Sequence, residues 1–145
     1  MTPLVLSYDI DCSPAHAFEV WTTRLSTWWP KGHSVSHDPA TVVSLEGYVG
    51  GRLLETTSSG EVIVFGTVTA WDPPRSFSYQ WHIGRDPSEA TDVTITFADA
   101  GDGTTRLGIE QTGWERLGAD AEAYRAGNTN GWSALLPSFL EACSP

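Results

Sequence analysis

The chain has 145 residues, of which 40% are hydrophobic, and its 18 acidic and 8 basic side chains give a formal net charge of −10. This length fits one compact domain, residues 1–145, and the apolar content is typical of a folded protein rather than a disordered one. The acidic balance argues against nucleic acid or an anionic membrane surface as a partner, because both attract clustered Lys and Arg.

The sequence has no stretch that predicts a membrane span or an export signal. No apolar run approaches about 18 residues, and the N-terminus MTPLVLSYDIDCS lacks the basic start and long apolar stretch of a signal peptide. We therefore expect a cytoplasmic protein without membrane insertion. In that compartment Cys12 and Cys143 are expected to be two buried or half-buried thiols rather than a disulfide framework.

The N-terminal segment predicts one strand followed by helix. Residues 4–10 put alternating apolar side chains on one face, the period of two that is typical of a strand. A Ser-Pro pair then opens a predicted helix over residues 14–25, with serine as N-cap and proline in the first turn. Ser26 is expected to cap a second short helical turn, which carries Trp28 and Trp29 and ends at the following proline.

From residue 41 onward the pattern changes to short β-rich runs separated by turns. The predicted strands are residues 41–46, 52–57, 61–71, 76–83, 91–97 and 104–112. Short connections between consecutive strands favour an antiparallel sheet, with one apolar face that needs cover. In 76–83, alternation places Trp81 on the apolar face and His82 on the outward polar face.

The last part of the chain predicts a helix. Apolar residues between 132 and 143 recur on one broad stripe at helical spacing. Gly127 and Gly131 are poor helix formers, so two alternatives stay open upstream of the stripe: a break, or a weak turn inside one long helix. This helix is the only predicted one that is long enough to cover the sheet.

An antiparallel sheet gripping one long C-terminal helix is the helix-grip arrangement, an α+β fold. Five local motifs carry a resemblance to a known family: RLSTWWP, GTVTAWDPPRSFSYQW, ATDVTITF, EQTGWERLG and NGWSALLPSFL. Together they resemble the START-like (SRPBCC) superfamily, and within it the branch named for the activator of the heat-shock-protein-90 ATPase, from about Leu6 to Leu140. The resemblance implies a curved antiparallel sheet of about seven strands wrapped around the C-terminal helix, with two short helices after the first strand.

The resemblance also implies a cavity between sheet and helix, because one helix does not fill so curved a sheet completely. Apolar and aromatic side chains projecting into it, with one glutamine, are the candidate ligand-binding residues: Trp28, Trp29, Phe65, Tyr79, Trp81, Ile95, Phe97, Ile109, Gln111, Trp132, Leu135, Leu136 and Phe139. Aromatic residues in such places are usually core. An apolar cavity with a few polar groups is, however, the usual form of a small-molecule site.

Other side chains give weaker indications of chemistry. His33 and His37 are four residues apart but lie in a loop without a third ligand nearby, so we expect them at the cavity mouth and predict no metal and no cofactor. Glu46 and Glu55 are interpreted as solvated strand carboxylates. Many proteins of the resembled family carry histidine where this chain has Gln111, which can orient a ligand but cannot transfer a proton.

Three functions follow as hypotheses. The first is binding of a hydrophobic, aromatic or polycyclic small molecule, in lipid or secondary-metabolite binding, transport or self-resistance. The second is an enzyme of the polyketide cyclase or hydrolase kind that uses the same cavity. The third is a stress-response role as a cofactor that stimulates a chaperone ATPase. A homodimer through an edge strand or a helix pair is an open alternative to a monomer.

Overall fold

The computed structural model describes residues 1–30 and 32–144. Its strands are β1 (Leu4–Ile10), β2 (Val42–Leu45), β3 (Arg52–Thr56), β4 (Val62–Asp72), β5 (Ser76–Trp81), β6 (Thr91–Gly101) and β7 (Thr104–Thr112). Its α-helices are α1 (Pro14–Trp21), α2 (Leu25–Trp28) and α3 (Ala121–Cys143), and its short 3₁₀ helices are η1 (Pro87–Glu89) and η2 (Trp114–Asp120).

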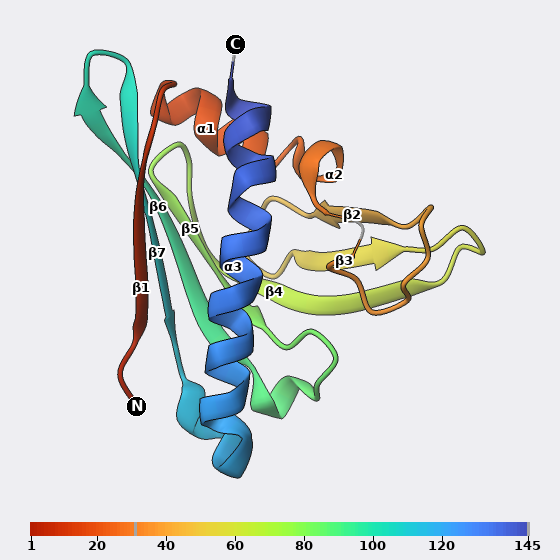
Figure 1. Cartoon of the computed structure of the whole chain (residues 1–145). Coiled ribbons are helices and arrows are strands. Elements are labelled where there is room, and N and C mark those ends of the chain that lie inside the picture. The colour runs from red at the N-terminus through yellow and green to blue at the C-terminus, as the bar shows by residue number, and fades with distance from the viewer. Residues whose placement is uncertain (31, 145) are drawn as a thin grey trace.

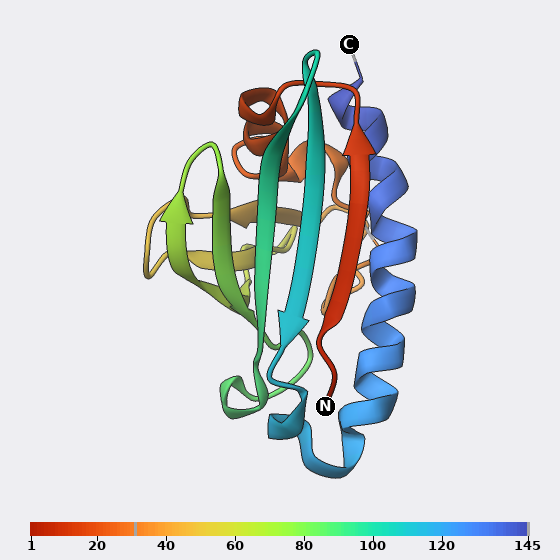
Figure 2. The ribbon, with the colours of Figure 1, turned by 90° about the vertical axis from the view of Figure 1, so that its left-hand side faces the viewer.

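The strands form one antiparallel sheet in the order β1-β7-β6-β5-β4-β3-β2 (Figure 2). The register shifts in β3–β4, β4–β5 and β6–β7, and such bulges bend a strand and increase its twist. At Gly66 in β4, a Cβ would lie 2.6 Å from the Gln80 carbonyl oxygen, so this close approach requires glycine. The predicted sheet of about seven strands, curled over its apolar face, is confirmed.

Helix α3 is continuous from Ala121 to Cys143 and runs beside β1 in the same direction (Figures 1 and 2). The structure thus decides between the two alternatives: Gly127 and Gly131 lie inside one long helix. Helix propensity is a weak preference that tertiary packing overrides, and α3 buries a stripe containing Trp132, Leu136 and Phe139 against the sheet. The helix-grip fold is confirmed.

The two short helices expected after the first strand are confirmed, but the first ends at Trp21 rather than at residue 25. Ser13 caps α1 as expected, because its Oγ accepts a hydrogen bond from the His16 N–H at 3.2 Å. Helix α1 ends at Trp21, and α2 starts only after an irregular turn. Ser26 is not the cap of α2, as we had expected; Arg24 holds that position without a side-chain cap.

The short helices cover the sheet together with α3, contrary to the expectation that α3 alone provides the cover. Phe18 of α1 lies 5.9 Å from Phe77 and 5.3 Å from Phe97, ring centre to ring centre. Trp21 lies 4.6 Å from Phe139 of α3 in an edge-to-face contact. Trp28 of α2 lies 5.2 Å from Phe139, so large rings from all three helices pack together under the curled sheet.

His82 is buried, contrary to the outward position that alternation predicted. Strand β5 ends at Trp81, so the period of two stops one residue before His82. The His82 N–H donates to the Phe65 carbonyl at 2.9 Å, and only 8% of the residue is exposed.

The two cysteines meet although almost the whole chain separates them. Cys143 in the last turn of α3 is buried, and Cys12 after β1 is half-buried, which confirms the expected burial. Burial raises the pKa of the Cys143 thiol, and contact with the Cys12 thiol raises it further. This contact ties the end of α3 to the junction between β1 and α1.

Candidate functional site

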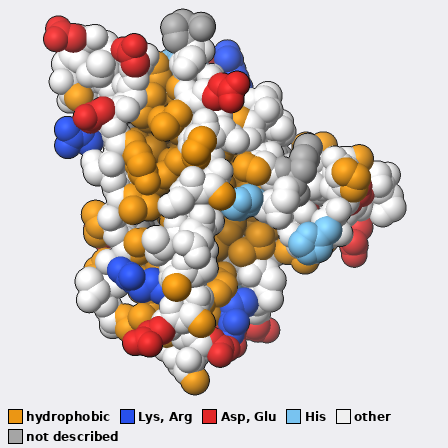
Figure 3. Space-filling model, viewed as in Figure 1, with side chains coloured by type: hydrophobic (Ala, Val, Ile, Leu, Met, Phe, Trp, Pro, Cys, Tyr) orange, Lys and Arg blue, Asp and Glu red, His pale blue; other side chains and the backbone are white. Residues whose placement is uncertain are grey.

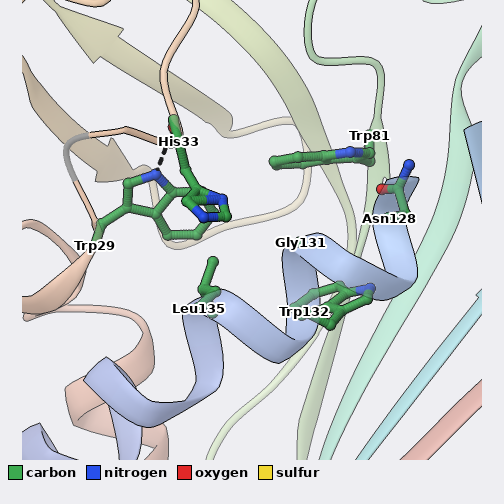
Figure 4. A pocket seen from close by; sticks show the side chains of 7 residues that line it. All are labelled: Trp29, His33, Trp81, Asn128, Gly131, Trp132 and Leu135. Carbon is green, nitrogen blue, oxygen red and sulfur yellow. Dashed lines mark hydrogen bonds between the residues drawn. The ribbon is translucent and has the colours of Figure 1, made fainter. Parts of the chain in front are cut away.

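A cleft lies between α3, the end of β5 and the segment that follows α2 (Figure 4). Its inner part has a volume of about 40 Å³ and is lined by Trp29, His33, Trp81, Asn128, Gly131, Trp132 and Leu135. It continues outward into a groove of about 330 Å³ that shares four of these residues and adds, among others, Tyr124 and Gly127. The inner part alone holds no more than a few waters, whereas the groove reaches the lower range of small-molecule sites, about 300 Å³.

Two glycines of α3 keep this cleft open. Gly127 and Gly131 lie one helical turn apart, so they share a face of the helix. A Cβ at Gly131 would lie 4.0 Å from the His33 ring, and a Cβ at Gly127 would have no atom within 4 Å. Each glycine costs a helix interior about 1 kcal/mol relative to alanine. From the sequence, these glycines were expected to weaken the helix. In the structure they lie inside it, and the absence of side chains there leaves room for the cleft.

Three indole rings border the cleft, and two of them are anchored by hydrogen bonds. The Trp29 Nε1–H donates to the His33 carbonyl at 2.8 Å, and the Trp132 Nε1–H donates to Gln111 Oε1 at 3.0 Å. Figure 4 shows Trp81 and Trp132 on opposite sides of the opening, with Gly131 between them. The walls are therefore flat and aromatic, and hydrogen bonds fix the orientation of Trp29 and Trp132. Figure 3 shows hydrophobic side chains exposed along both sides of α3 on this face.

Gln111 forms a buried polar network directly behind the cleft. Its Nε2 donates to Thr91 Oγ1 at 2.8 Å and to Asn128 Oδ1 at 3.2 Å, while its Oε1 accepts from Trp132. Asn128 in turn donates to the Tyr124 carbonyl at 2.8 Å. Both N–H groups of Gln111 are used within the protein. Gln111 therefore positions Asn128 and Trp132 and does not itself line the cleft.

Glu55 is buried, which corrects its interpretation as a solvated carboxylate. It is 0% exposed and accepts hydrogen bonds from the Ser36 N–H at 2.7 Å and the Val35 N–H at 3.3 Å. The carboxylate thereby holds the segment that carries His33 against β3. Glu46 instead pairs with Arg52 near the surface, and this contact lowers the pKa of Glu46 to about 2.

The structure divides the predicted ligand-binding residues into two groups. Trp29, Trp81, Trp132 and Leu135 line the cleft. The others lie behind it in the core and are nearly or fully buried: Trp28, Phe65, Tyr79, Ile95, Phe97, Ile109, Gln111, Leu136 and Phe139.

Sequence reasoning missed part of the lining. Asn128 and Gly131 border the inner cavity, and Tyr124 and Gly127 border the groove. A signal existed, because these four residues fall on one helical face at spacings of three and four. Of the two predicted mouth histidines, His33 lines the cavity, while His37 is exposed and does not line it.

Burial lowers the pKa of His33, so its imidazole is neutral at pH 7. A neutral imidazole can both accept and donate a hydrogen bond inside the cleft. Residues 1–30 and 32–144 contain no group of three or more His, Cys, Asp or Glu side chains placed to hold a metal ion. Within the same ranges, no helix combines the length and the apolar character needed to cross a membrane.

A curled antiparallel sheet, a long C-terminal helix and an apolar cleft beside that helix define a helix-grip protein of the START-like superfamily. More narrowly, the chain belongs to the family of activator of Hsp90 ATPase homolog 1-like proteins, whose model matches residues 11–144. The resemblance drawn from the sequence motifs is thereby confirmed. No functionally curated protein matches the sequence.

Several solved structures are similar over most of the chain. CalC from Micromonospora echinospora, a self-sacrificing resistance protein, is 26% identical with a TM-score of 0.71, covering 97% of this chain and 93% of CalC. Txn09, an anthrahydroquino-gamma-pyrone synthase, is 29% identical with a TM-score of 0.59, covering 85% and 84% of the two chains. An Hsp90 activator from Plasmodium falciparum is 18% identical with a TM-score of 0.54, covering 77% and 73%, a likeness that concerns the fold alone.

Proposed function

We propose that this protein binds a hydrophobic aromatic small molecule in the cleft beside α3. The observation that carries the proposal is a cleft that two glycines of the continuous helix α3 keep open and that three indole rings border. Apolar walls with a few polar groups are typical of small-molecule sites. Affinity would come mainly from apolar burial, at about 25 cal/mol per Å² before the costs of association.

The similar structures support this proposal and suggest a setting for it. CalC is a resistance protein and Txn09 is a synthase of an aromatic product, and each is more than a quarter identical to this chain. Binding or sequestration of an aromatic secondary metabolite, as in self-resistance or transport, is therefore the form of the function that we favour.

The blocking substitution Gly131→Leu tests the cleft. A leucine side chain there would occupy the space between Trp81 and Trp132, so the affinity for N-phenyl-1-naphthylamine should fall at least tenfold. This neutral dye becomes fluorescent in apolar sites, and titration gives its Kd. Leucine is a better helix former than glycine by about 0.8 kcal/mol, so the free energy of unfolding should not fall.

The matched control is Ala134→Leu, at an exposed position of the same helix outside the cleft. It should leave dye affinity unchanged. Equal dye binding by wild type and Gly131→Leu would place the dye elsewhere and would contradict the proposed site.

Dye binding should also depend on pH through His33. Burial favours the neutral imidazole, and a bound dye excludes water from it further, so protonation opposes binding. Affinity is then full at pH 8 and declines as the pH falls through the lowered pKa of His33, below about 6.5. Titrations from pH 8 to 5 should show this decline in the wild type and in His37→Asn, which changes an exposed histidine, but not in His33→Asn.

The enzyme hypothesis has one observation in its favour. His33 lines the inner cavity and is neutral at pH 7, so it could accept a proton from a bound substrate. For an enzyme, His33→Asn should abolish conversion of the substrate at pH 8 while leaving its affinity nearly intact. If the protein only binds its ligand, the wild type itself will not convert the ligand at pH 8.

The remaining expectations stay predictions. These are a chaperone partner, a homodimer and a cytoplasmic location. Stimulation of the Hsp90 ATPase by the purified protein would test the first, and sedimentation equilibrium would test the second.

A further inference from the structure

Two buried polar atoms beside the cleft have no hydrogen-bond partner among the described residues. They are Trp81 Nε1 and the Tyr124 hydroxyl oxygen. Native proteins pair nearly all buried polar atoms, so each exception calls for a reason. Trp81 lines both the inner cavity and the groove, and Tyr124 lines the groove. Both orphaned atoms therefore belong to residues of one site.

The two orphaned groups are close to each other. Burial raises the pKa of Tyr124, and Asn128, Arg85 and Trp81 offset part of this rise. Trp81 and Asn128 are thus near the Tyr124 hydroxyl, although neither makes a hydrogen bond of ordinary geometry with it. Figure 4 shows the nitrogen end of the Trp81 ring turned towards Asn128.

The ring of Tyr124 is fixed, so its hydroxyl has little freedom to find another partner. The Arg85 guanidinium lies 5.4 Å from the ring centre, and Trp114 packs against the ring edge-to-face at 6.3 Å. Arg85 is itself held by ion pairs to Glu89 at 2.6 Å and Asp120 at 2.9 Å. The buried hydroxyl is therefore held at a set place beside the groove, and a ligand that enters the groove could reach it.

A hydroxyl can accept one hydrogen bond from the indole N–H and donate another onward. We infer that Tyr124, supported by Trp81, donates a hydrogen bond to an oxygen acceptor of the ligand, and that the ligand is a flat aromatic ketone. Its rings would lie against the indole walls and the glycine face of α3, with the carbonyl oxygen at the Tyr124 hydroxyl. This inference rests on the proposed function and specifies the ligand class for the same site.

Two probes of nearly the same shape separate the hydrogen bond from apolar burial. Fluorenone carries a carbonyl oxygen on a flat tricyclic frame, and fluorene has a methylene group in its place. Each is titrated against bound N-phenyl-1-naphthylamine to obtain its Kd for wild type and for Tyr124→Phe. Tyr48→Phe, at an exposed tyrosine, is the matched control.

We expect Tyr124→Phe to weaken fluorenone binding about three- to tenfold and to leave fluorene binding within twofold. Tyr48→Phe should change neither. The carbonyl stretching band of bound fluorenone should lie at lower wavenumber in the wild type than in Tyr124→Phe. If Tyr124→Phe is poorly folded, Trp81→Phe removes the supporting N–H and should weaken fluorenone binding in the same direction.

An equal fluorenone-to-fluorene affinity ratio in wild type and both variants would overturn the inference while leaving the proposed function in place. Failure of both probes to displace the dye from the wild type would also overturn it. Failure of the proposed function is recognised separately, by dye binding that Gly131→Leu does not change.

Discussion

Replacing Phe139 by alanine should lower the free energy of unfolding by about 3–5 kcal/mol. Phe139 is 0% exposed and lies between two helices, 4.6 Å from the Trp21 ring and 5.2 Å from the Trp28 ring, centre to centre. Alanine would leave a cavity that large, rigid neighbours cannot fill. Urea denaturation followed by Trp fluorescence measures the loss, and Leu140→Ala, a half-buried neighbour, should cost clearly less.

This expectation also separates Phe139 from the cleft residues. The sequence put both Phe139 and Trp81 among the ligand-binding residues, but the structure places Phe139 in the core and Trp81 at the cleft. The milder Phe139→Leu should therefore lower stability while keeping dye affinity within about twofold. A variant that folds as well as the wild type but no longer binds dye would restore Phe139 to the binding wall.

Gln111→Leu should destabilise the protein by about 3 kcal/mol, although leucine is apolar and similar in size. The change leaves the Trp132 N–H and the Asn128 amide oxygen without their partner, and it removes one of the two hydrogen bonds of the Thr91 hydroxyl. Each buried polar group left unpaired costs about 1–3 kcal/mol. The free energy of unfolding, again from urea denaturation, should fall accordingly.

The matched control for this experiment is Gln80→Leu, at an exposed position of β5, which should change stability by less than about 0.5 kcal/mol. Because Asn128 and Trp132 line the cleft, Gln111→Leu should weaken dye binding as well. Wild-type stability of Gln111→Leu would show that the network contributes little and would contradict its role as a support of the cleft.

Local patterns were enough to predict the fold. Alternation in 4–10 and 91–97, turn residues between short runs, and the apolar stripe of the last helix each specify a local structure that the fold retains. Errors occurred where a pattern changed within a few residues. Strand β5 ends at Trp81, one residue before His82. Helix α2 already starts at Leu25, so Ser26 lies inside it and is not its N-cap.

The site was predicted less well, because burial alone does not distinguish a core ring from a lining ring. The alternating pattern correctly predicted that Tyr79 and Trp81 face the apolar side of the sheet. Tyr79, however, packs in the core with its ring 5.7 Å from that of Phe77, whereas Trp81 borders the cleft. The difference depends on which residue of helix α3 lies opposite each ring. Near Trp81 that helix presents Gly131, whereas deeper in the core it presents large apolar side chains.

The sequence by itself therefore determined the strands, the helices and their antiparallel order, since these follow from the spacing of apolar residues and from turn chemistry. Three features became visible only in the tertiary structure. Glu55 is buried and accepts hydrogen bonds from backbone amides, Cys12 contacts Cys143, and two glycines of α3 leave a cleft open. Each of these features depends on contacts between segments that are distant in sequence. The local spacing of apolar residues does not predict which side chains of two such segments will be in contact.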